Sequence, residues 1–122
     1  MTCAVLIALL TLAAFGRIVG HPFVSLDDKE YVTENPHVLQ GLTGEGFRWA
    51  LTTFHSANWH PLTWLSHMTD VQIFGLSPAG HHAVSLLFHL AAAVALFFVL
   101  SRMTGASGRS FFVAALFAVH PL

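Results

Sequence analysis

The chain has 122 residues, of which 55% are hydrophobic and 9% are charged, and its mean hydropathy is +0.67. Soluble domains carry about 25% charged residues, so the composition is that of a membrane protein. A net charge of −1 with five Lys and Arg excludes the basic footprint that nucleic-acid binding requires. The single cysteine, Cys3, excludes an internal disulfide framework and a cysteine-based metal site.

The first apolar segment covers residues 2–20 and is almost wholly apolar as far as Phe15. A signal peptide is the alternative interpretation, and it requires a basic start and a cleavage site of small residues. No Lys or Arg precedes Arg17, and Thr11-Leu12-Ala13 is a poor cleavage site. We therefore expect a first membrane span over about 2–20.

A polar loop over residues 21–80 follows and contains all six acidic residues. Asn35-Pro36 predicts a turn within it, because a residue before proline avoids the helical region. Helical spacing predicts a short helix over 47–54. Its apolar face would consist of Phe47, Ala50, Leu51 and Phe54. The loop also has aromatic side chains to bury, which argue against disorder: Phe47, Trp49, Phe54, Trp59, Trp64 and Phe74.

A longer helix is expected over 61–74, because Pro61 suits a first helical position and Gly75 suits the position after the end. Its apolar stripe would contain Leu62, Leu65, Met68 and Phe74, with Trp64 and Val71 alongside. Tryptophan-containing segments of low charge often lie in the membrane interface. The alternative is a helix that caps the membrane bundle.

The second span is expected over about 82–101, in a helix that Ser77 caps and Pro78 begins. Its uncharged part, Ala83–Ser101, would be about 28 Å long, which crosses a hydrocarbon core. A third span over 110–122 is shorter than the ~20 residues a span requires, so we expect an N-terminal piece of a longer protein. Arg102 and Arg109 flank the turn between these spans, which places that turn in the cytoplasm and loop 21–80 on the opposite face.

Nine histidines make haem or metal binding an alternative to consider. His82 and His89 are seven residues apart and would form a haem pair only with a second helix. Zinc ligation would require paired spacing on one helix face with carboxylate or cysteine partners. We expect the histidines to serve helix packing and interfacial hydrogen bonds, and we expect no metal and no cofactor. His89, in the middle of a span, should face the bundle or a cavity.

The pair Asp27-Asp28 is the best catalytic candidate, since phosphate-binding loops and common hydrolase or metalloprotease motifs are absent from the sequence. Adjacent carboxylates just outside a span repel each other and lose hydration if the site closes. One of them could act as a general base toward an acceptor hydroxyl. The alternative is a solvated acidic turn at the membrane surface.

Four short motifs in order resemble the N-terminal part of the GT-C membrane glycosyltransferases. They are Phe23-Val24-Ser25-Leu26-Asp27-Asp28 with Tyr31-Val32, then Trp59-His60-Pro61-Leu62-Thr63, then Phe74-Gly75-Leu76-Ser77-Pro78-Ala79-Gly80-His81-His82, and finally Ala118-Val119-His120-Pro121. The likeness is greatest to the transmembrane and tetratricopeptide-repeat O-mannosyltransferase type and its bacterial relatives. It covers nearly the whole chain.

The resemblance implies an all-α membrane protein, the N-terminal part of a polytopic GT-C-like bundle with amphipathic helices in its first outer loop. It implies one incomplete membrane domain over 1–122, in the bacterial inner membrane or the endoplasmic reticulum. The helix over 61–74 would lie at the interface over the lipid carrier. Such enzymes transfer a sugar, with inversion, from a polyprenyl phosphate to a hydroxyl acceptor on a protein or glycan at the non-cytoplasmic face.

By position, the resemblance makes Asp27 the base, with Asp28 beside the acceptor or influencing the ionisation of Asp27. Tyr31, Trp59 and His60 would bind substrate. Relatives commonly have Arg-Pro-Leu-Thr where this chain has His60-Pro61-Leu62-Thr63, so a cation at that site is replaced by a hydrogen-bond donor. The chain alone is expected to be inactive.

Two other functions stay open at this point. A non-enzymatic multi-span protein could use the outer loop to dock partners, with or without tetratricopeptide repeats further along. Asp27 and Asp28 would then tolerate substitution, and Trp59 and Trp64 would matter more. A histidine-rich haem or metal membrane protein is the third reading, which absorbance and metal content would test.

Overall fold

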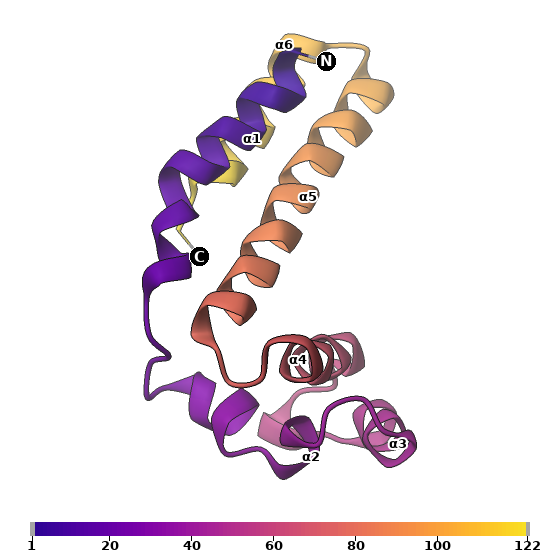
Figure 1. Cartoon of the computed structure of the whole chain (residues 1–122). Coiled ribbons are helices and arrows are strands. Elements are labelled where there is room, and N and C mark those ends of the chain that lie inside the picture. The colour runs from indigo at the N-terminus through magenta and orange to yellow at the C-terminus, as the bar shows by residue number, and fades with distance from the viewer. Residues whose placement is uncertain (1, 122) are drawn as a thin grey trace. The chain divides into compact units, whose positions relative to one another are not determined.

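The computed structural model describes residues 2–121 and is helical, with no strand in that range (Figure 1). The chain forms two compact units. The apolar unit comprises the chain up to Val19 and from His82 onward, and the loop unit comprises residues 20–81. This is an all-α membrane architecture, because two helical stretches are long and apolar enough to cross a bilayer.

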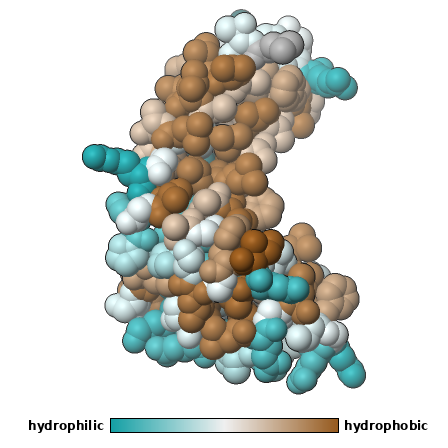
Figure 2. Space-filling model, viewed as in Figure 1, coloured by the Kyte–Doolittle hydropathy of each residue, from teal (hydrophilic) through white to brown (hydrophobic). Residues whose placement is uncertain are grey.

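These two stretches are Thr2–Gly20 and Pro78–Thr104, and only 11% of the most apolar window of each is buried within the protein. A core helix of a soluble protein would be mostly buried, so their exposure favours a lipid environment. The visible surface of α1 and α5 is predominantly apolar, whereas polar side chains gather over the loop unit (Figure 2).

The first stretch is an α-helix, α1 (Thr2–Phe15), followed by a 3₁₀ turn, Gly16–Gly20. The expected second span, 82–101, lies within α5 (Pro78–Thr104), which begins at the proline that the sequence indicated. The expected third span, 110–122, overlaps α6 (Ser107–Val119). Its last residue, Leu122, lies outside the described residues.

The core of the apolar unit combines small and large side chains. It consists of Ile7, Ala93, Phe97, Ala114 and Ala118, with Cys3 packed beside it. The alanines let the helix backbones approach closely, as is usual between membrane helices, and α1 and α6 pack side by side (Figure 1). His89 faces this bundle as expected, since its Nε2 lies 3.1 Å from the carbonyl oxygen of Ala118 in α6.

The loop unit has its own core, formed by α2 (Pro36–Leu39), α3 (Gly44–Thr52) and α4 (Pro61–Phe74). Its fully buried apolar side chains are Val38, Ala50, Trp64 and Met68. Tyr31, Trp49, Leu65 and Val71 pack around them. The unit also contains a π-helical turn, Lys29–Thr33, and a 3₁₀ turn, His55–Ala57.

Helix α4 has the bounds that Pro61 and Gly75 predicted, and Gly75 adopts φ 61° and ψ −139°, a conformation that is essentially restricted to glycine. The expected apolar stripe is wrong in part. Met68 is buried beside Trp64, but Leu62 is 80% exposed and Phe74 is 42% exposed. Residues 64, 68 and 71 share one helix face, and α2 and α3 cover that face.

The short helix predicted over 47–54 begins and ends earlier. Helix α3 runs Gly44–Thr52, because the Thr43 hydroxyl caps it by accepting from the backbone N–H of Gly46 at 2.9 Å. Its buried face contains Gly46 and Ala50. Phe47 and Phe54, expected on that face, are 51% and 72% exposed.

Of the six aromatic residues expected to form the loop's core, only Trp64 is fully buried. The turn predicted at Asn35-Pro36 is the start of α2. Asn35 is extended, with φ −85° and ψ 109°, as a residue before proline should be, and its side chain caps the helix.

Candidate active site

Asp27 and Asp28 lie directly before the π-helical turn Lys29–Thr33 and line a cleft of about 420 Å³ in the loop unit. The other lining residues come from that turn, from the segment before α4 and from α4 itself. They are Tyr31, Val32, Asn58, His60, Thr63 and His67. The fold therefore brings two of the three predicted substrate-binding residues, Tyr31 and His60, to the same cleft as the carboxylates.

The two carboxylates have different local roles. Asp28 is half-buried, and its Oδ2 accepts a hydrogen bond from the backbone N–H of Val24 at 2.7 Å. This hydrogen bond connects the backbone at Val24 with the start of the π-helical turn. Asp27 is exposed, and its carboxylate has no hydrogen bond or ion pair with the described part of the chain. Asp27 is thus the carboxylate with its lone pairs available for a substrate.

Trp64 is the central support beneath the cleft. The Tyr31 ring stacks on it with centroids 4.8 Å apart and planes inclined by 23°, and the His60 ring meets it edge-on at 4.9 Å. Tyr31 and His60 are 5.4 Å apart by ring centroids. Because Trp64 is fully buried in α4, it fixes the positions of both rings on a rigid element.

His60 has a ring nitrogen that could form a hydrogen bond with a ligand. It is half-buried directly before α4, and its Nε2 is buried without a hydrogen-bond partner among residues 2–121. A buried ring nitrogen without a partner loses its hydration without compensation. A bound molecule reaching this nitrogen would recover that loss.

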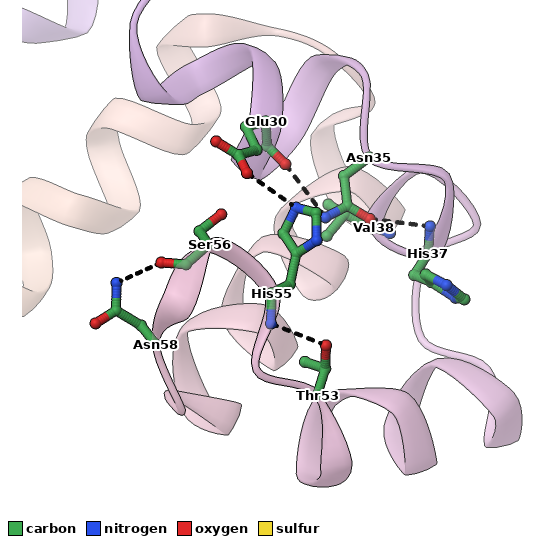
Figure 3. A network of polar contacts seen from close by, with 8 residues as sticks. All are labelled: Glu30, Asn35, His37, Val38, Thr53, His55, Ser56 and Asn58. Atoms are coloured by element: carbon green, nitrogen blue, oxygen red, sulfur yellow. Dashed lines mark hydrogen bonds and ion pairs between the residues drawn. The ribbon is translucent and has the colours of Figure 1, made fainter.

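A polar network holds the turn that carries Tyr31 (Figure 3). Glu30 pairs with His55, with Oε1 and Nε2 3.5 Å apart, and its carbonyl oxygen accepts from Asn35 Nδ2 at 3.2 Å. The Asn35 side-chain oxygen accepts from the backbone N–H groups of His37 and Val38. The network links the two segments that border the cleft, 29–35 and 55–58.

Trp59, the third predicted substrate-binding residue, does not line the cleft. Its indole N–H donates to the carbonyl oxygen of Leu51 at 2.9 Å, and the side chain is 59% exposed. Trp59 therefore packs its polar edge against the end of α3.

His67 is a cleft residue that the sequence reasoning missed. Burial lowers the pKa of His67, nearby His81 and His60 lower it further, and Asp28 acts in the opposite direction. Three residues further along α4, burial raises the pKa of the Asp70 carboxyl, and nearby His81 partly offsets this rise. The spacing of His67 and Asp70, three residues apart on one helix, was the available signal.

The fold and the site together define an all-α membrane protein with an acidic, aromatic-lined cleft in its loop unit. The chain resembles curated proteins over nearly its whole length. It is 29% identical over 132 residues to protein O-mannosyl-transferase TMTC1 of Mus musculus and 27% identical to the same-named protein of Homo sapiens.

These alignments cover 98% of this chain and 14% of each relative, so the chain spans about a seventh of the length of the curated proteins it matches. No family model and no solved structure matches it.

Proposed function

We propose that this chain supplies the acceptor-activating cleft of a membrane glycosyltransferase of the GT-C type. The observation that carries the proposal is Asp27, an exposed carboxylate without a partner among the described residues, in a cleft shared with Tyr31 and His60. The activity is proposed for the complete protein and not for this chain alone, because the chain spans about a seventh of the length of the relatives it matches.

In the proposed reaction, the oxygen of an acceptor hydroxyl attacks the anomeric carbon of a sugar carried on polyprenyl phosphate. The bond from that carbon to the phosphate oxygen breaks, and polyprenyl phosphate leaves with the electron pair. Asp27 takes the hydroxyl proton as general base, a contribution of about 10²–10⁴-fold in rate. Attack opposite the leaving phosphate inverts the anomeric centre.

The local contacts support different roles for the two carboxylates. Asp28 already accepts a hydrogen bond from the Val24 backbone N–H, which occupies one of its carboxylate oxygens and gives it a positioning role. His60 would donate a hydrogen bond to the donor phosphate, in the place where the family resemblance implies arginine. Tyr31, held by Trp64, would contact the acceptor or the sugar.

Helix α4 presents apolar side chains to its surroundings that would suit the lipid carrier. Leu62 is 80% exposed and Ile73 is 65% exposed. Apolar side chains on an exposed helix of low charge favour the membrane interface. The loop unit would lie at the non-cytoplasmic face, since the turn at Arg102 and Arg109 would be cytoplasmic.

The complete protein in lipid nanodiscs tests the donor class. With a peptide rich in Ser and Thr as acceptor, polyprenyl-phosphate mannose should support transfer, whereas GDP-mannose should not. Transfer from the nucleotide sugar would overturn the lipid-linked donor. No transfer from either, with tight binding of a protein partner to the loop unit, would favour the docking interpretation.

A further inference from the structure

His67, Asp70 and His81 form a second polar cluster beside the cleft. His67 and Asp70 lie on the same face of α4, and His81 belongs to the first turn of α5. One potential ligand atom from each lies within 4.8 Å of the other two. Asp70 and His81 are only 4% and 3% exposed, and His67 is half-buried.

The tautomer of His81 follows from its hydrogen bond. Its Nε2 lies 3.0 Å from the carbonyl oxygen of Gly75, and a carbonyl can only accept, so Nε2 carries a proton. In the neutral ring Nδ1 is then a bare lone pair. Histidines that bind metals usually donate their other N–H to such a carbonyl, which fixes the ring for ligation.

The bare nitrogen faces another acceptor. His81 Nδ1 has no hydrogen-bond partner among the described residues, and it lies 3.7 Å from Asp70 Oδ2. His67 Nδ1 is likewise buried without a hydrogen-bond partner in that range. Two buried acceptors that face each other repel unless a cation lies between them. A proton on His81 Nδ1 would remove the repulsion between His81 and Asp70 only. A metal ion would give a partner to all three residues.

We infer that His67, Asp70 and His81 bind one divalent transition-metal ion, best fitted by Zn²⁺. Two imidazoles and one carboxylate are ligands of zinc sites that leave a fourth position open. Ligand atoms around tetrahedral zinc are roughly 3.4 Å apart for bonds near 2.05 Å, close to the 3.7 Å between His81 and Asp70. Mg²⁺ and Ca²⁺ prefer oxygen ligands alone, which this cluster does not offer.

The location gives the ion two consequences. It would fasten the first turn of α5 to α4 across the Gly75 turn. Because His67 also lines the cleft with Asp27 and Asp28, the ion would add positive charge at the cleft wall. The inference requires no sugar transfer, so its test is independent of the proposed function.

The test uses the chain in detergent, purified through a tag without histidine, stripped with EDTA and titrated with Zn²⁺ by calorimetry. We expect one Zn²⁺ per chain. Asp70→Asn and His81→Gln should each weaken binding by roughly tenfold or more. The matched control is the ion pair of exposed Glu30 and half-buried His55, with Oε1 and Nε2 3.5 Å apart, whose variants Glu30→Gln and His55→Gln should bind Zn²⁺ as the parent does.

A second measurement covers variants that fold poorly. Zn²⁺ added to the unaltered chain should slow hydrogen exchange in peptides covering residues 61–81, and Co²⁺ should give the visible absorption of a tetrahedral site. Absence of Zn²⁺ binding, or binding that Asp70→Asn and His81→Gln leave unchanged, would overturn the inference. Such a result would leave a plain Asp70–His81 ion pair.

Discussion

Replacement of Trp64 by alanine tests whether this side chain holds the loop unit together. Trp64 is fully buried and contacts Tyr31, Trp49 and His60 by their rings. Truncation of a buried aromatic residue to alanine costs about 3–5 kcal/mol. The Trp64 indole N–H is buried without a partner among the described residues, and its removal recovers about 1 kcal/mol. The net expectation is therefore about 2–4 kcal/mol.

Hydrogen exchange of the chain in detergent measures this effect within the loop unit. A loss of 2–4 kcal/mol in local opening free energy corresponds to roughly 30- to 700-fold faster exchange. Peptides covering 29–39 and 61–74 should show it. Trp64→Phe keeps a ring and removes the unpaired N–H, so its exchange should rise much less.

Trp59→Ala is the matched control, because Trp59 is 59% exposed and makes one hydrogen bond, to Leu51. It should cost about 0.5–1.5 kcal/mol. If Trp64→Ala and Trp59→Ala accelerate exchange equally, Trp64 is not the central support of the cleft.

Three further predictions concern the frame of the cleft and its placement. Asn35→Ala removes the cap of α2 and the hydrogen bond to the Glu30 carbonyl. Hydrogen exchange in residues 29–39 should therefore accelerate by an amount equivalent to about 1–2 kcal/mol of local opening free energy. Parent-like exchange would contradict the role of the polar network. Gly75→Ala should cost about 1–3 kcal/mol, because φ 61° with ψ −139° is a conformation essentially restricted to glycine. Gly44→Ala also meets open space but at an ordinary φ, so it should cost nothing; equal effects would exclude backbone strain. In a Cys3→Ser background, Glu45→Cys should react with an impermeant thiol reagent from the non-cytoplasmic side and Ser107→Cys only after permeabilisation, and the reverse pattern would invert the topology.

The bounds of α4 could be predicted because local chemistry sets them. Proline fits a first helical position, and glycine after the last position tolerates a positive φ that other residues rarely adopt, and neither effect depends on distant residues. Which face of α4 is buried could not be predicted, because that depends on Val38 and Ala50 from α2 and α3. Leu62 and Phe74 are apolar, but they remain 80% and 42% exposed.

The candidate site likewise combines residues that could be predicted from the sequence with contacts that could not. Asp27, Asp28, Tyr31 and His60 could be named from short motifs, and the fold places them around one cleft. The difference between the carboxylates depends on the bond from the Val24 N–H to Asp28, which adjacent sequence positions do not reveal. The cluster of His67, Asp70 and His81 depends on the turn at Gly75, which returns the chain to the face of α4.

The most direct test of the account is the transfer rate of the complete protein carrying Asp27→Asn, measured with polyprenyl-phosphate mannose at saturating acceptor. We predict a loss of about 10²–10⁴-fold in kcat, with normal membrane insertion and unchanged exchange in the loop unit. Asp28→Asn should lose less and should accelerate exchange near Val24. Glu45 is an exposed acid that does not line the cleft, so Glu45→Gln should match the parent. Parent-like activity of Asp27→Asn would contradict the assignment of Asp27 as the base.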